Sequence, residues 1–193
     1  MNTIKETIEN TLIIKNSRFI TIIYNINDIN DIDKYLKLVK DKYKDATHYC
    51  YAYILPNNIK CSDDGEPGGT AGKPILDVLT KHNLSFVLAI VVRYFGGIKL
   101  GAGGLIRAYS KCISTCLNNS KLTKLILGKN IDIYFTYKDI NDIDLLLTIC
   151  HINNKNYQDM ISYNVNIPND LLPILENKYQ VKVNNDIYIK SDM

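Results

Sequence analysis

Apolar and polar residues alternate most regularly in Ala46–Leu55, whose sequence is ATHYCYAYIL. A period of two is typical of a β-strand, because successive side chains point to opposite faces of a sheet. Phe86–Phe95 is almost continuously apolar, which indicates a strand buried on both faces. Thr11–Tyr24 predicts one or two further strands, with a break near Asn16 and Ser17. The faces of the alternating strand would carry His48, Cys50, Ala52 and Ile54 on one side and Tyr49, Tyr51, Tyr53 and Leu55 on the other.

Three segments repeat apolar residues at spacings of three and four, which predicts amphipathic helices. The first begins near Asn27 and runs through Val39. The second begins at Pro74, a residue suited to the first turn of a helix, and ends near His82. The third, Leu105–Leu117, follows a glycine-rich loop. Strands and helices together predict an α+β domain over residues 1–122.

A polar stretch around residues 118–124 predicts a domain boundary, and a smaller unit, 123–193, follows it. Its pattern predicts the order strand, helix, strand, strand, helix, strand, which is ferredoxin-like. The two middle strands form either one bent strand or a hairpin. The expected elements are Ile131–Tyr137, Asp139–His151, Tyr157–Ile167, Pro168–Tyr179 and Gln180–Lys190.

The length, charge and composition of the chain limit the classes of protein to which it can belong. A chain of 193 residues accommodates two domains, and its formal net charge of +3 is unevenly spread, since residues 1–118 alone carry +4. This charge permits an anionic partner without requiring one. The N-terminus lacks the pattern of a signal peptide, and the longest apolar run, Phe86–Val92, is too short to span a bilayer. We therefore expect a soluble cytoplasmic protein with no membrane partner, whose five cysteines form no disulfide framework.

Two glycine-rich loops each precede a predicted helix and each contain one lysine. They are Ser62–Pro74, SDDGEPGGTAGKP, and Gly96–Gly104, GGIKLGAGG. Glycines let a ligand approach the backbone, and a helix start offers unpaired N–H groups, so such loops can bind phosphate. The structural alternative is that the glycines serve turns and close helix–sheet contacts. The Walker and Rossmann nucleotide signatures are not met, and we expect no cofactor.

The first loop also holds three carboxylates, Asp63, Asp64 and Glu66. They could bind a divalent metal or share a proton. They could equally cap turns by accepting the backbone N–H groups of Gly65, Gly68 and Gly69, and we favour this role.

Other residues of the first domain carry chemistry with a structural alternative. His48 and Cys50 share a strand face and could support nucleophilic or metal chemistry, but a buried cysteine is usually inert. The three strand tyrosines could stack nucleic-acid bases or simply cover a half-buried sheet. Arg93 interrupts a buried strand, so it either pairs with a carboxylate of the first loop or reaches a ligand. The expected phosphate-binding groups are Lys73, Arg93, Lys99, Arg107, Gly68, Gly69, Gly101 and Gly103.

Three blocks of the sequence resemble the hallmark motifs of the IMPACT/YigZ family. They are ATHYCYAY, SDDGEPGGTAGKPIL and VVRYFGGIKLGAGGLIRAY, and NSRFI at Asn16–Ile20 is similar to the family's first block. The resemblance covers roughly residues 11–118. It implies that the first domain resembles domain 2 of ribosomal protein S5 and domain IV of elongation factor G, with helices on one face of a four-stranded sheet. It likewise implies that the tail resembles the ferredoxin-like domain that follows in that elongation factor.

The resemblance implies binding to RNA or the ribosome, linked to translation regulation, without enzyme activity. The alternative is an enzyme or binding protein acting on a phosphorylated small molecule, with His48, Asp64 and Glu66 supplying metal or proton chemistry. A third hypothesis is a protein-interaction module that uses the open sheet face of the tail.

Overall fold

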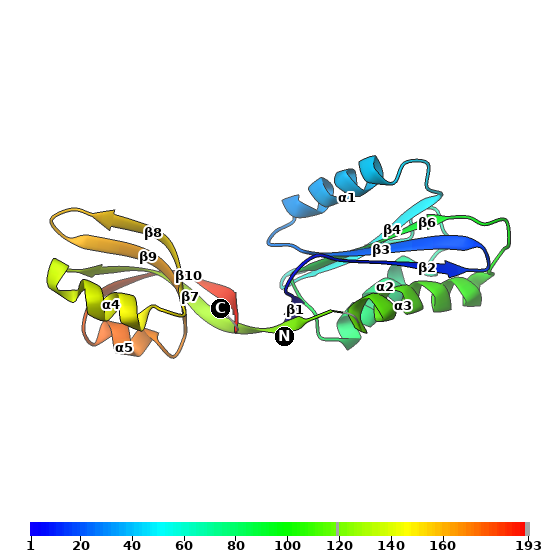
Figure 1. The fold of residues 1–193 in the computed structure, drawn as a ribbon. Helices are drawn as coiled ribbons and strands as arrows, with labels where there is room; N and C mark the ends of the chain where they lie inside the picture. The colour runs from blue at the N-terminus through cyan, green and yellow to red at the C-terminus, as the bar shows by residue number, and fades with distance from the viewer. Residues whose placement is uncertain (119, 192–193) are drawn as a thin grey trace. The chain divides into compact units, whose positions relative to one another are not determined.

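The computed structural model describes residues 1–118 and 120–191, which form two compact units, Met1–Thr123 and Lys124–Met193. Figure 1 shows their elements in chain order. The first unit contains β1 (Asn2–Ile4), β2 (Ile8–Ile14), β3 (Ser17–Asn25), α1 (Asn30–Lys42), β4 (His48–Leu55), β5 (Asn58–Ser62), α2 (Gly72–Lys81), β6 (Val87–Tyr94) and α3 (Ala102–Asn118). Strand β7 (Leu122–Phe135) begins two residues before the boundary, and the second unit contains the rest of it. The other elements of that unit are the 3₁₀ turn η1 (Tyr137–Asp139), α4 (Ile140–Leu146), β8 (His151–Tyr157), β9 (Ile161–Pro168), α5 (Leu172–Glu176) and β10 (Gln180–Lys190).

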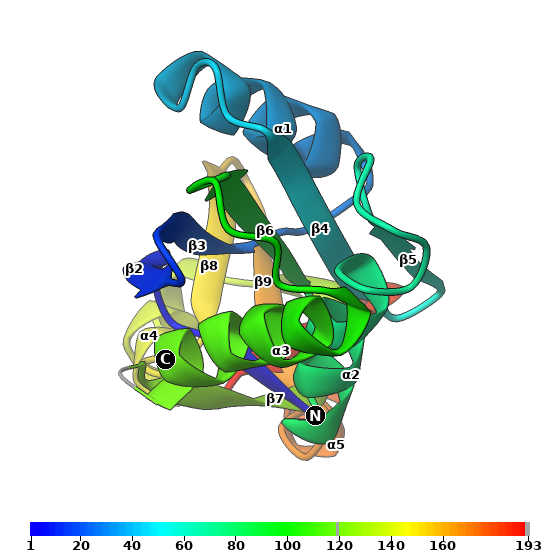
Figure 2. The same cartoon turned by 90° about the vertical axis from the view of Figure 1, so that its right-hand side faces the viewer.

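The sheet of the first unit has five antiparallel strands in the order β2-β3-β6-β4-β5. Helices α2 and α3 cover one face, and α1 covers the other (Figure 2). The expected four-stranded sheet with helices on one face was therefore wrong in both respects. The cause is visible in β6, whose residues Val87 to Val92 are all buried, since a strand apolar on both faces needs a helix layer on each side.

The alternation of β4 is confirmed. Cys50, Ala52 and Ile54 lie in the core beneath α2 and α3. The tyrosines of the opposite face pack in the second core, beneath α1, where Tyr53 is 4% exposed. This packing corrects the hypothesis of a base-stacking platform, because a covered ring face cannot receive a base.

The turns that border the site are set by unusual backbone conformations. Lys15 and Asn16 both have positive φ, 44° and 63°, which joins β2 and β3 by a two-residue turn at the predicted break. Helix α2 begins at Gly72, two residues before the predicted Pro74, and ends at Lys81 as expected. None of the helices among residues 1–118 and 120–191 is long and apolar enough to cross a membrane.

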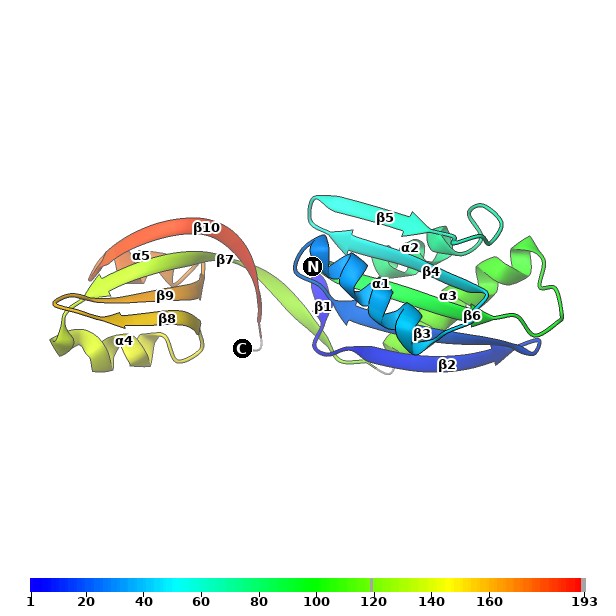
Figure 3. The same ribbon diagram turned by 90° about the horizontal axis from the view of Figure 1, so that it is seen from above.

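In the second unit the elements follow the predicted order. Its strands pair antiparallel in the order β10-β7-β9-β8 (Figure 3). Helices α4 and α5 contribute Ile143 and Leu175 to a core with the sheet. The middle pair is a hairpin, β8 and β9, rather than one bent strand. Both helices are shorter than predicted, although the apolar periodicity of the sequence continues beyond their ends. There the chain forms turns instead of helix, closed by backbone hydrogen bonds such as the one from Cys150 N–H to Leu147 O.

Candidate functional site

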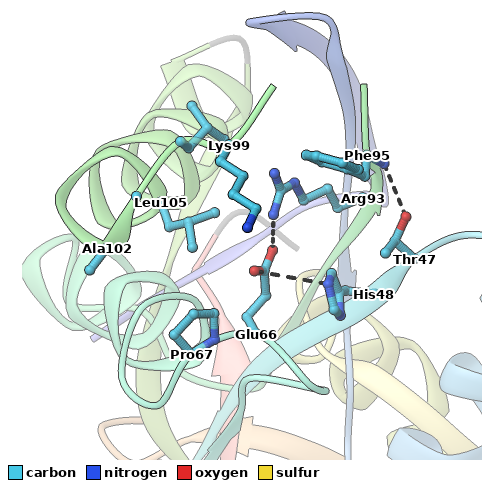
Figure 4. A pocket seen from close by; sticks show the side chains of 11 residues that line it. Thr47, His48, Glu66, Pro67, Arg93, Phe95, Lys99, Ala102 and Leu105 are labelled. Atoms are coloured by element: carbon cyan, nitrogen blue, oxygen red, sulfur yellow. Dashed lines mark hydrogen bonds and ion pairs between the residues drawn. The ribbon is translucent and has the colours of Figure 1, made fainter. Parts of the chain in front are cut away.

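A cavity of about 420 Å³ opens between the two glycine-rich loops of the first unit. Its walls come from the start of β4, the first loop, the end of β6, the second loop and the start of α3 (Figure 4). Charged side chains therefore meet there from segments far apart in the sequence. The lining residues are Thr47, His48, Glu66, Pro67, Arg93, Phe95, Lys99, Leu100, Gly101, Ala102 and Leu105.

Glu66 forms the buried centre of this cavity, with its side chain only 3% exposed. Its Oε1 accepts a hydrogen bond from Arg93 Nη1 at 2.5 Å and another from the Tyr109 hydroxyl at 2.8 Å. The predicted pairing of Arg93 with a first-loop carboxylate is confirmed, and the partner is Glu66. The guanidinium and the phenol together fix the position of this buried carboxylate.

Arg93 lies between two aromatic rings, with its guanidinium carbon 5.3 Å from the Phe19 centroid and 5.5 Å from the Phe95 centroid. Its Nη2 donates to Ser17 Oγ at 3.4 Å. Among the residues that the structure describes, Arg93 Nε is the one buried side-chain nitrogen or oxygen atom without a hydrogen-bond partner. An unpaired buried donor carries a free-energy cost, which the ion pair with Glu66 and the contacts with the two rings help to offset.

Lys99 extends from the second loop with its amino group directed into the cavity, on the side of Arg93 and Glu66 (Figure 4). No ion pair in the described part of the chain involves Lys99. Two cations thus face the cavity against one carboxylate, which already binds Arg93. The arrangement favours an anionic ligand.

His48 lies across the cavity from Lys99. Its Nδ1 is 2.8 Å from the backbone oxygen of Asp64, and its Nε2 is 3.9 Å from Glu66 Oε2. A carbonyl oxygen only accepts, so Nδ1 donates this hydrogen bond and Nε2 lies toward Glu66 and the cavity. A ring nitrogen in this position can share a hydrogen bond with a group bound in the cavity.

Asp63 holds the first loop together by accepting hydrogen bonds from three backbone N–H groups at its far end. Its Oδ1 accepts the N–H groups of Ala71 and Gly72 at 2.9 and 2.8 Å, and its Oδ2 accepts that of Gly69 at 2.8 Å. Burial raises the pKa of the Asp63 carboxyl, but these three backbone hydrogen bonds outweigh it and leave the pKa below the ordinary 3.8. The capping role is confirmed at Gly69. Within residues 1–118 and 120–191, no carboxylate bonds to the Gly65 or Gly68 amide.

The first loop is therefore not the anion site that its composition suggests. The Gly69 amide faces Asp63 instead of a phosphate, which corrects its predicted role. Lys73 forms an ion pair with Asp77, 2.8 Å away and one turn along α2, and neither Lys73 nor Gly68 lines the cavity. Asp64 Oδ2 accepts the Tyr49 N–H at 2.6 Å. The described residues contain no group of three or more His, Cys, Asp or Glu side chains placed to hold a metal ion.

The second loop is built differently. A Cβ at Gly96 would lie 2.1 Å from the backbone carbon of Asn16, so this glycine permits close contact with the β2–β3 turn. Gly101 has φ +71° and its carbonyl accepts the Leu105 N–H at 2.9 Å. No hydrogen bond in the described chain engages the N–H groups of Ala102, Gly103 and Gly104, the first turn of α3. Of these residues, Ala102 lines the cavity together with Lys99 and Gly101, Gly104 lines a neighbouring groove, and Gly103, an expected phosphate contact, lines neither.

Cys50 does not supply a nucleophile. Its thiol donates to the Asp63 backbone oxygen at 2.9 Å, and burial raises its pKa to about 12. Burial likewise raises the pKa values of Cys112 and Cys116, to about 12 and about 11. These thiols are protonated at neutral pH and belong to the core, as expected for buried cysteines.

Two features of the site were not predicted from the sequence. The first is the position of Arg107, which lies outside the cavity, in a neighbouring groove beyond Leu100. Tyr109 lies within the predicted helix 105–117 and is fully buried, yet its hydroxyl donates a hydrogen bond that orients Glu66. The sequence could have indicated this role of Tyr109, because a buried tyrosine hydroxyl needs a hydrogen-bond partner.

Comparisons with known proteins fit this site-bearing unit. The Impact N-terminal domain matches residues 15–117. IMPACT family member YvyE of Bacillus subtilis is 47% identical over 120 residues, which is 61% of this chain and 55% of that protein, so the match spans only about half of that relative's length. IMPACT family member YigZ of Escherichia coli is 33% identical over 162 residues, 80% of this chain and 79% of that protein. A crystal structure described as a hypothetical protein has a TM-score of 0.70 at 28% identity and covers 95% of this chain and 97% of its own. The chain belongs to the IMPACT family.

Proposed function

We propose that the chain is an RNA-binding or ribosome-associated protein that acts in translation regulation in the cytoplasm, without catalysing a reaction. The observation that carries this proposal is the second glycine loop. Unengaged N–H groups at the start of α3 lie there beside Lys99 and the buried Arg93.

The chemistry of phosphate fits this arrangement. Helix N-termini bind phosphate through their backbone N–H groups and the positive end of the helix dipole. Lys99 adds a mobile charge, and the guanidinium of Arg93 adds a second cation to the wall of the cavity. Gly101 and Gly103 have no side chain to obstruct the approach, and open space surrounds the Cβ position of Gly101.

The proposal extends to the domains. We assign residues 1–122 to the domain type of ribosomal protein S5 domain 2, in a form with a fifth strand and with α1 on the second face of the sheet; α2 and α3 packing together on the first face supports this. We assign 123–193 to the ferredoxin-like type, supported by the element order and the strand order β10-β7-β9-β8. Both fold types occur in proteins of the translation machinery, a likeness of fold that adds modest weight.

Filter binding of ribosomal RNA across a salt series tests the proposal. Affinity should fall steeply with salt, because each neutralised phosphate releases counterions. The Lys99→Gln variant should weaken binding, whereas Lys73→Gln, whose side chain lies outside the cavity, should not. Absent binding, or binding indifferent to salt, contradicts the proposal.

A second candidate function is turnover or binding of a phosphorylated small molecule, favoured by His48 Nε2 and Glu66 Oε2, which lie 3.9 Å apart in the wall of one cavity. His48 Nε2 would accept a proton from a bound hydroxyl or water while the second loop held the phosphate. A thermal-shift screen of phosphorylated metabolites with and without Mg²⁺ distinguishes the two functions. A clear rise in melting temperature with one metabolite, lost in His48→Gln, would favour the small molecule over RNA.

A further inference from the structure

A second basic depression lies next to the candidate site. It is a groove of about 210 Å³, formed by the β2–β3 turn, the end of the second loop and the outer face of α3. Its charged lining residues are Lys15, Arg107 and Lys111, and no carboxylate lines it. Leu100 lines both this groove and the cavity, so the two depressions adjoin at one side chain.

The three cations of the groove have no acidic partner. No ion pair among residues 1–118 and 120–191 involves Lys15, Arg107 or Lys111. Arg107 and Lys111 are one helical turn apart, and like charges at that spacing repel. By contrast, the exposed lysines Lys42, Lys73 and Lys155 each form an ion pair with a carboxylate. The groove thus concentrates uncompensated positive charge.

Hydrogen bonds tie the groove to the cavity. Ser17 Oγ, directly after the turn that carries Lys15, accepts bonds from Arg93 Nη2 and from the Gly96 N–H at 3.2 Å. The close approach at Gly96 fixes the turn against the second loop. Figures 1 and 3 agree that the β2–β3 turn and the loop before α3 lie at the same end of the sheet. Lys15 is therefore held in a defined position relative to Arg93, although 78 residues separate the two.

We infer that this groove is a second phosphate subsite, and that the ligand is a single-stranded RNA segment that passes over Leu100 with one phosphate in the cavity and another in the groove. The inference rests on the proposed function. Phe95, 46% exposed at the rim of the cavity, offers an aromatic face to an unpaired base, which favours a single strand over a duplex. A ligand with one phosphate would use the cavity alone.

Three matched variants test the inference. The triple variant Lys15→Gln/Arg107→Gln/Lys111→Gln neutralises the groove, and Lys99→Gln alters the cavity. The control Lys34→Gln/Lys37→Gln/Lys40→Gln removes the same charge from exposed positions on α1, on the opposite face of the sheet. All the altered lysines and Arg107 are exposed, so each variant should fold, as checked by circular dichroism.

The probes are oligouridylates of several nucleotides and uridine monophosphate. For oligouridylate, the slope of log affinity against log salt should fall by about 0.7 in the groove variant, since a single strand contributes about 0.7 per phosphate contact and the groove holds one phosphate. The control should keep the wild-type slope. Binding of the monophosphate should weaken in Lys99→Gln and remain unchanged in the groove variant.

The outcomes separate the two proposals. If the groove variant keeps the slope of the α1 control while Lys99→Gln loses affinity, the second subsite is rejected and the proposed function stands. If wild-type protein binds no oligouridylate or ribosomal RNA at low salt, both are rejected.

Discussion

The two glycine-rich loops of the first unit share a composition and a position before a helix, yet they use their backbone N–H groups in opposite ways. In the first loop, Asp63 occupies the amides of Gly69, Ala71 and Gly72. In the second, the amides of the first turn of α3 bond to nothing in the described chain. Glycine content alone therefore does not identify an anion site. The deciding factor is whether a carboxylate of the chain itself accepts the N–H groups at the start of the helix.

The loops also differ in what their charged residues contribute. Glu66 of the first loop is the negative group that holds Arg93 in the wall of the cavity. Lys99 of the second loop has no such partner among the residues that the structure describes, and it faces the cavity. In the proposed function, the first loop supports the site and the second loop receives the ligand.

The largest effect is expected from removing the ion pair that links the loops. Arg93→Met leaves Glu66 buried without its guanidinium, and we expect a loss of about 3–5 kcal/mol in the free energy of unfolding, measured in urea. The double variant Arg93→Met/Glu66→Met removes both charges, so it should recover most of that stability. A single variant as stable as the wild type would show that the pair does not hold the loops.

The next effect concerns the close contact of the second loop. Gly96→Ala places a Cβ against the backbone of Asn16, which cannot move aside as a side chain can, so we expect a loss of about 3 kcal/mol. Gly103→Ala is the matched control, because its Cβ meets only Arg107 Nη1 at 3.5 Å. Its stability should be unchanged or raised by up to about 1 kcal/mol. Equal effects of the two substitutions would contradict the distinction between these glycines.

A smaller effect is expected from opening the first loop. Asp63→Ala removes the cap of α2 and should cost about 2 kcal/mol at neutral pH. Asp77→Ala, which breaks only the exposed pair with Lys73, should leave stability nearly unchanged.

The contribution of Asp63 should depend on pH in a defined direction. The folded-state pKa of Asp63 lies below the ordinary 3.8, so its stabilisation is complete above that value and is lost as the pH falls through the lowered one. The stability difference between wild type and Asp63→Ala should therefore shrink below about pH 4. A difference that stays constant between pH 7 and pH 3 would mean that the charge of Asp63 does not matter.

Local patterns predicted much of this molecule. The alternation of β4, the two-sided burial of β6 and the bounds of β10 follow from side-chain periodicity, because burial repeats with the geometry of the element. The need of Arg93 for a carboxylate followed from the cost of burying a charge. These inferences require knowledge of one segment at a time.

The remaining features depend on long-range contacts that no local pattern encodes. Asp63 reaches forward to the Gly72 amide only because a Cβ-free Gly72 packs against the backbone of Ser62. The groove exists because the β2–β3 turn meets the second loop about 80 residues later. The identity of the Arg93 partner, among three carboxylates within four residues, likewise depends on how the first loop turns.

The most direct test labels the ten glycines with ¹⁵N and follows their backbone N–H signals during titration with a short oligouridylate. The loops are then compared in a single spectrum of one intact protein. Our account predicts that the signals of Gly101, Gly103 and Gly104 shift with saturation, whereas those of Gly69 and Gly72, bonded to Asp63, stay in place. Shifts confined to Gly69 and Gly72, or no shift at any glycine of the second loop, would contradict it.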